Sequence, residues 1–178
     1  MDCKKALLDT DGDIDKAVEL LRTKGIAKAE KRAGRQASEG VIGSYVHFNG
    51  RVAVMVELNS ETDFVARTDD FQQLAKDIAM HLASANPLAV NAEDVPADVI
   101  ERERAIFDAQ VAESGKPEQV RPKIVDGKLK KYFKEIVLME QPFVKDDKKS
   151  VADIVKGVSG KLGENLVVRR FVRYELGA

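Results

Sequence analysis

The sequence predicts an α+β fold in which a small three-stranded antiparallel sheet packs with helices. Three observations predict it: two alternating apolar segments that flank Asn49-Gly50, a third alternating segment at 165–176, and helical periodicity in the segments between them. The remaining helical patterns predict a helical head fragment at the N-terminus and an antiparallel helical coiled-coil insertion.

Composition limits the class of protein. The chain has 178 residues, of which 44% are hydrophobic, and a chain of this length buries roughly 70% of its unfolded surface. With 29 Lys+Arg against 30 Asp+Glu, the net charge is -1. Because dedicated nucleic-acid binders carry a clear basic excess, no direct nucleic-acid partner is expected. The apolar runs fall far short of the roughly 20 residues that span a bilayer. No apolar signal-peptide segment follows the first lysines, so we expect a cytoplasmic protein without a membrane partner.

The pattern of residues 1–24 predicts a head of two short helices, 3–8 and 14–24. Asp13 is the expected N-cap of the second helix, and Gly25 is expected just past its end. Two helices of this size cannot bury their apolar faces alone, so a partner helix is expected to be missing. Residues 25–39 are rich in Ala, Lys and Arg, with few large apolar side chains. This composition predicts a basic, solvated linker helix.

Residues 40–178 are expected to form the core. Strands are predicted over 41–48 and 51–58, joined by Asn49-Gly50 as a two-residue type I′ turn. A helix over 68–85 follows and ends before Asn86-Pro87. Its buried stripe is expected to consist of Phe71, Leu74, Ala75, Ile78 and Leu82.

A helical pair is predicted at about 95–136, with Pro96 at a first helical position and a turn at 115–117. Its apolar seam is narrow and flanked by charges, which is typical of a coiled coil. Ile100, Phe107, Val111, Val125, Leu129, Tyr132 and Ile136 form this seam.

A helix over 150–161 and a strand over 165–176 complete the core. In this strand Leu166, Val168, Val172 and Tyr174 are expected on one face. Arg170 interrupts that face, so it requires a charged partner or an edge position.

Catalytic and cofactor chemistry finds little support. One cysteine and two histidines exclude a disulfide framework and make a Cys- or His-based metal site improbable. The acidic turn at 9–13 has Ile14 and Leu20 where a calcium-binding loop requires Gly and Glu. The basic stretch 28–35 could contact phosphates but has no interleaved aromatic residue, which favours a solvated face. No metal, cofactor or catalytic residue is therefore predicted, and the chain is not expected to be an enzyme.

Phe64 is a bulky apolar residue in a polar segment. The run Asn59-Ser60-Glu61-Thr62-Asp63-Phe64-Val65-Ala66-Arg67, placed after a β-hairpin, closely resembles the signature of the translation elongation factor Ts family. Segments 1–7, 114–117, 141–146 and 162–170 resemble other motifs of that family. The resemblance covers essentially the whole chain, with the motifs in the same order.

The resemblance implies a guanine nucleotide exchange factor that binds elongation factor Tu·GDP during translation elongation. It would promote GDP release by disturbing the Mg²⁺ and phosphate site of that GTPase. The partner-binding residues implied are Thr62, Asp63, Phe64 and Val65, with Met1 and Asp2 as additional ones. The alternative is a protein-interaction scaffold without exchange activity. From the residues alone, Phe64 could equally be tucked under its own domain.

Two departures from the family pattern affect the prediction. Family members begin with a further helix and a Thr-Gly-Ala-Gly-Met stretch before the residue that matches Met1. The chain is therefore interpreted as N-terminally truncated, with 1–24 as a partial ubiquitin-associated-like head. Longer members carry two core subdomains, whereas this sequence resembles the short form with a single core. This difference predicts a homodimer through the core sheet.

Overall fold

A computed structural model of the chain describes residues 2–178. It divides into two compact units, one formed by the chain up to Ala83 together with Ala152–Ala178, the other by Ser84–Val151. The first contains the head and the sheet, and the second contains the helical pair. Each unit is described by itself.

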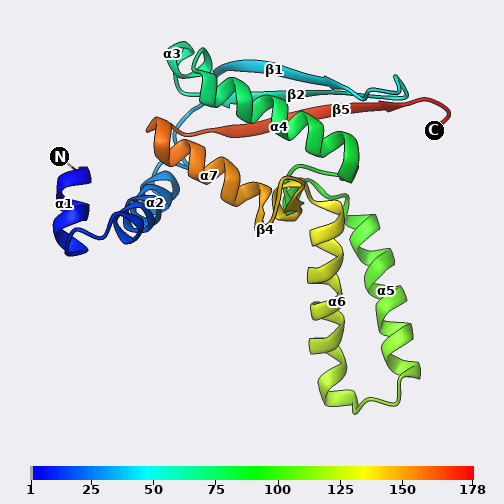
Figure 1. Cartoon of the computed structure of the whole chain (residues 1–178). Coiled ribbons are helices and arrows are strands. Elements are labelled where there is room, and N and C mark those ends of the chain that lie inside the picture. The colour runs from blue at the N-terminus through cyan, green and yellow to red at the C-terminus, as the bar shows by residue number, and fades with distance from the viewer. Residues whose placement is uncertain (1) are drawn as a thin grey trace. The chain divides into compact units, whose positions relative to one another are not determined.

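The first unit is built on the predicted three-stranded antiparallel sheet. The strands are β1 (Glu39–Val46), β2 (Val52–Ser60) and β5 (Val167–Glu175), in the spatial order β1-β2-β5. Helix α4 (Asp69–Ala85) runs along one face of the sheet (Figure 1). The predicted stripe of α4 is confirmed, since all five of its members are buried. They share the core with the inward side chains of β2, which are Val54, Val56 and Leu58.

The β1–β2 hairpin forms, but the predicted type I′ turn is wrong. That turn needs positive φ at Asn49, and the non-glycine residues described with positive φ are Asp11 and Asn86. Instead Gly50 N–H donates to His47 O at 2.8 Å and Gly50 has φ 69°. Val46 pairs with Ala53 and His47 N–H donates to Val52 O at 2.8 Å, so residues 48–51 form a four-residue loop in which glycine takes the left-handed position. The loop begins with Phe48, whose side chain is 91% exposed.

The predicted face of the last strand is also wrong in part. The register between β2 and β5 shifts at Glu57/Leu58, and such a bulge turns the following side chains to the opposite face. Val168 is therefore buried, whereas Val172 and Tyr174 are exposed. Both expectations for Arg170 are met: β5 is an edge strand, and Arg170 Nε lies 2.7 Å from Glu57 Oε2.

The head contains α1 (Asp2–Asp9) and α2 (Ile14–Glu30). Asp13 is confirmed as N-cap, because its carboxylate accepts from Lys16 N–H at 3.0 Å. The expected end at Gly25 is wrong: α2 continues to Glu30, and turns and coil follow up to Ser38. There is thus no separate linker helix over 25–39.

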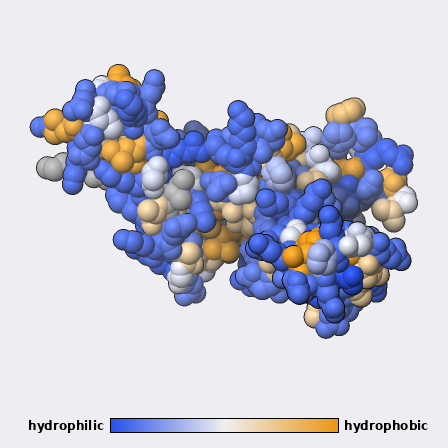
Figure 2. Space-filling view, turned by 90° about the horizontal axis from the view of Figure 1, so that it is seen from below, coloured by the Kyte–Doolittle hydropathy of each residue, from blue (hydrophilic) through white to orange (hydrophobic). Residues whose placement is uncertain are grey.

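Gly25 lies inside α2, where another helix approaches it closely. A Cβ built on Gly160 of α7 (Val151–Leu162) would lie 2.8 Å from the carbonyl carbon of Gly25. The head also exposes apolar side chains, which are visible among hydrophilic ones where α1 and α2 lie (Figure 2). These side chains are Leu7, Leu8, Ile14 and Val18.

The second unit contains the predicted helical pair, α5 (Ala97–Glu113) and α6 (Arg121–Ile136). Val111, Val125 and Leu129 form one buried cluster of the seam, with Phe107 against it. Ile100 and Ile136 pack against a second cluster at the base. Short elements that the sequence did not predict complete this unit: η1 (Ala92–Asp94), η2 (Glu118–Val120), η3 (Leu138–Glu140), β3 (Pro142–Phe143) and β4 (Asp146–Ser150). Within residues 2–178, no helix is long and apolar enough to cross a bilayer.

Candidate functional site

The candidate site is a single helical turn, α3 (Asp63–Ala66), that follows β2 directly. Thr62 is its N-cap, with the hydroxyl 3.5 Å from Val65 N–H. Ala66 is buried, whereas Phe64 is 77% exposed. Two residues along a helix rotate a side chain by about 200°, so the turn that buries Ala66 must direct Phe64 outward. The interpretation in which Phe64 is tucked under its own domain is therefore wrong.

Two side chains hold the C-terminal end of this turn, one from Thr68 immediately before α4 and one from Gln72 within α4. The Thr68 hydroxyl donates to Val65 O at 2.8 Å, and the Gln72 amide donates to Ala66 O at 2.7 Å. Asp63 Oδ2 lies 2.7 Å from Arg67 Nη2, with the Arg67 side chain exposed and the Asp63 side chain about half exposed. An exposed pair of this kind stabilises by at most about 1 kcal/mol, so Asp63 can exchange this partner for another at small cost.

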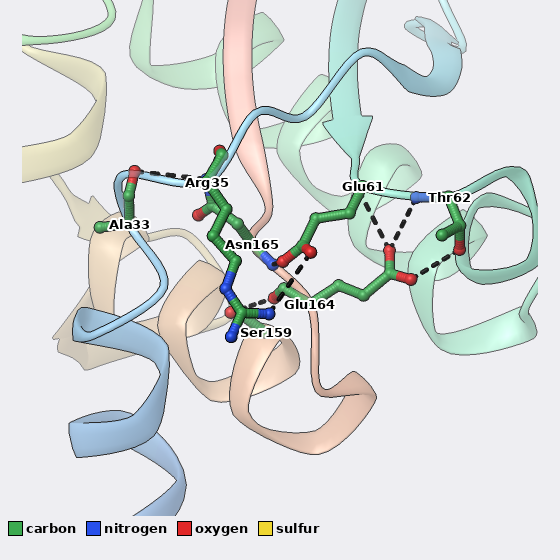
Figure 3. Close-up of polar contacts among 7 residues, drawn as sticks. All are labelled: Ala33, Arg35, Glu61, Thr62, Ser159, Glu164 and Asn165. Atoms are coloured by element: carbon green, nitrogen blue, oxygen red, sulfur yellow. Dashed lines mark hydrogen bonds and ion pairs between the residues drawn. The ribbon is translucent and has the colours of Figure 1, made fainter.

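The N-terminal end is held by Glu164, which lies in the connection between α7 and β5 (Figure 3). Glu164 Oε2 accepts from the backbone N–H of Glu61 at 3.1 Å and of Thr62 at 3.0 Å. Glu164 Oε1 accepts from the Thr62 hydroxyl at 2.6 Å. One half-buried carboxylate thus binds three donors immediately before the turn that carries Phe64.

A second carboxylate makes the reciprocal contact. Glu61 Oε1 accepts from Asn165 N–H at 2.7 Å, and Glu61 Oε2 lies 3.5 Å from Arg35 Nη1. The buried Asn165 amide donates to the carbonyls of Ala33 and Arg35 at 3.3 and 2.8 Å. Residues 33–35, 61–62 and 164–165 therefore meet in one polar network (Figure 3).

Glycine makes the approach of Glu164 possible. Gly163 has φ 82°, a left-handed conformation that ends α7, and its N–H donates to Ser159 O at 2.9 Å. The Ser159 hydroxyl donates to Glu164 O at 2.5 Å. These two bonds fix the direction in which the chain leaves the helix and so bring Glu164 beside Thr62.

The structure brings Thr62, Asp63, Phe64 and Val65 together in and before one turn, with Val65 half-buried. Met1 lies outside the described residues. Asp2 is described as the first residue of α1, without its side chain. No group of three or more His, Cys, Asp or Glu side chains within residues 2–178 could hold a metal ion.

Sequence reasoning did not identify the roles of Glu61, Glu164 and Asn165. Glu61 and Asn165 are 104 residues apart, and Glu164 and Thr62 are 102 apart. No periodicity or spacing within one segment signals such contacts. The one available signal was that 59–67 and 162–170 both lie in motifs through which the chain resembles a known family.

Comparison with known proteins gives the family. The sequence model described as "Elongation factor TS" matches residues 23–178. Elongation factor Ts of Syntrophomonas wolfei is 56% identical over 177 residues, which are 99% of this chain and 83% of that protein. Elongation factor Ts of Solidesulfovibrio magneticus is 56% identical over 99% of this chain and 88% of its own length. The protein of the same name from Oleidesulfovibrio alaskensis is 55% identical over 100% of this chain and 90% of its own.

The fold, the site and these similarities define a translation elongation factor. The chain belongs to the elongation factor Ts family.

Proposed function

We propose that this chain is a guanine nucleotide exchange factor that binds elongation factor Tu·GDP and promotes release of GDP. The observation that carries the proposal is the exposed Phe64 on a turn that is hydrogen-bonded at both ends. Large aromatic side chains contribute much of the binding energy at protein interfaces when a partner pocket buries them. A solvated Phe64 has no such contact in the isolated chain.

Exchange requires a difference in affinity between two states of the partner. The factor must bind the nucleotide-free GTPase more tightly than the GDP-bound form. Insertion of Phe64 would displace partner residues near the Mg²⁺ and phosphate site, while Asp63 exchanges its contact with Arg67 for polar groups of the partner. Because Mg²⁺ requires near-ideal octahedral coordination, a small shift of its ligands weakens GDP binding. No covalent step and no cofactor of this chain are involved.

The test is release of a fluorescent GDP analogue from elongation factor Tu, followed in time after addition of excess unlabelled GDP. Acceleration that increases with the concentration of this chain supports the proposal. Binding without acceleration would refute it and favour the alternative, a scaffold without exchange activity. Isothermal titration of the same two proteins separates these outcomes.

We further propose a homodimer through the core sheet. The face of the sheet opposite α4 exposes apolar side chains from all three strands, namely Ile42, Val46, Met55, Val172 and Tyr174. An exposed apolar patch of this kind marks a protein interface more often than an isolated exposed side chain does. A second copy offers the same face, as a two-fold interface requires.

The remaining proposals concern location and other partners. We propose a cytoplasmic protein, in accordance with translation, and no direct nucleic-acid partner. Within the stretch 28–35, Arg35 is directed to Glu61, which lowers the positive charge offered to phosphates. Met1 and Asp2 remain proposed additional contacts to elongation factor Tu.

A further inference from the structure

We propose that Glu164 is a positioning residue for exchange: its carboxylate orders the turn that carries Phe64. The inference rests on the proposed function, because it assigns Glu164 a role in the action of Phe64. It starts from the exposure of Phe64, which leaves that side chain without packing partners at home to fix its direction. The direction of Phe64 therefore depends on how the backbone of α3 is held.

The contacts of Glu164 determine which hydrogen bond the Thr62 hydroxyl donates and which one it accepts. A hydroxyl has one proton to donate, and the Thr62 hydroxyl donates it to Glu164 Oε1 at 2.6 Å. Its lone pairs then remain available to accept from Val65 N–H. Glu164 thus acts on the first turn twice, directly through the N–H groups of residues 61 and 62 and indirectly through Thr62.

The charge of Glu164 matters as well as its shape. A carboxylate only accepts hydrogen bonds, and here all three neighbouring groups are donors. A glutamine has the same shape but offers one oxygen and one NH₂ group. In Glu164→Gln the NH₂ group must face either the Thr62 hydroxyl or two backbone N–H groups, so at least one of these contacts weakens.

The reciprocal contact makes the arrangement specific. Glu61 accepts from Asn165 N–H while Glu164 accepts from Glu61 N–H, so each segment binds the backbone of the other. This exchange fixes the register between the end of β2 and the start of β5. Sites that must be held within a fraction of an ångström commonly depend on such supporting contacts.

Two measurements test the proposal. The first is hydrogen exchange of a peptide covering 59–67, which we expect to be faster in Glu164→Ala and Glu164→Gln than in the parent. This readout needs no GTPase, so it tests the ordering role even if the proposed exchange function fails. Unchanged protection in both variants would overturn the proposal.

The second measurement is a double-mutant cycle on the rate of GDP release from elongation factor Tu. We expect Glu164→Ala to lower kcat/KM about 10- to 100-fold, since misplacing an acting group by about 1 Å can cost that much. In the Phe64→Ala background, Glu164→Ala should lower kcat/KM by about twofold or less, because the side chain that Glu164 positions is absent. Equal losses in both backgrounds would show a role independent of Phe64 and overturn the proposal.

Controls separate positioning from loss of a charge or of the fold. Asp126→Ala removes a carboxylate paired with Arg104 at 3.1 Å in the helical pair, and we expect parental exchange. If Glu164→Ala does not fold, Glu164→Gln replaces it in the cycle, since glutamine keeps the size of the side chain. A parent chain that fails to accelerate GDP release would refute the exchange function, and hydrogen exchange would then decide the positioning role.

Discussion

Replacing Phe64 by Ala should reduce exchange strongly and stability only slightly. An aromatic side chain buries on the order of 200 Å², and 77% of Phe64 is exposed, which leaves about 150 Å² for a partner. At about 25 cal/mol per Å², burial of this area stabilises a complex by up to about 4 kcal/mol. That corresponds to a loss of up to about 700-fold in affinity for the state that Phe64 binds. The area already buried at home amounts to about 1 kcal/mol of folding free energy.

The assay is the concentration dependence of GDP release from elongation factor Tu, with thermal unfolding measured alongside. The matched control is Phe48→Ala, which removes an aromatic side chain that is 91% exposed at the hairpin tip. We expect Phe48→Ala to exchange GDP like the parent. A Phe64→Ala variant with parental exchange would refute the argument, as would equal losses in both variants.

Three further predictions concern other parts of the chain. Val172→Glu places a charge in the exposed sheet face, so the mass in solution, measured by sedimentation, should shift toward the monomer; an unchanged dimer would exclude this face. Gly160→Ala should lower the free energy of unfolding by about 1–3 kcal/mol, because the new Cβ would lie 2.8 Å from the backbone of Gly25. A Cβ at Gly157 would meet nothing within 4 Å, so Gly157→Ala should be neutral or stabilising by up to about 1 kcal/mol. Chemical denaturation of the two variants distinguishes these outcomes. Burial, and then nearby glutamates, raises the pKa of Tyr132 above its ordinary 10.0. The contribution of Tyr132 to stability is therefore present below pH 10 and is lost as pH rises through the pKa of the folded state. The free energy of unfolding, measured against pH in the parent and in Tyr132→Phe, tests this.

Much of the fold could be predicted because its signals are local. The stripe of α4 repeats every three or four residues, and the alternation in 41–58 identifies two strands whichever loop joins them. Asp13 could be identified as N-cap because its partner, Lys16 N–H, lies three residues away. In each case the residues that determine the element lie within that element.

Apart from the local error in the hairpin loop, the errors in α2 and β5 arose where a distant segment lies against the element. Gly25 is a local signal for a helix end, but it lies inside α2, at a point where α7 approaches closely through Gly160. The alternation of β5 predicts Val168 and Val172 on the same face, but the bulge against β2 separates them. The family resemblance pointed to Phe64, yet the sequence could not decide between exposure and burial, because the answer depends on which face of α3 meets the core.

The contrast between local signals and distant contacts also explains why the conformation of α3 depends on individual polar residues. Ordering the four residues of α3 costs roughly 4–8 kcal/mol of backbone entropy, and burial of the small Ala66 side chain returns about 1 kcal/mol at most. The buried part of Phe64 adds about 1 kcal/mol and the half-buried Val65 contributes as well, but hydrogen bonds, each with a net contribution of about 1 kcal/mol, supply much of the rest. Glu164 accepts three of them, the Thr62 hydroxyl accepts another, and Thr68 and Gln72 donate one each. A turn stabilised in this way can direct Phe64 into solvent, which packing against the core could not do, and its order should therefore depend more on Glu164 than on any apolar side chain of the turn.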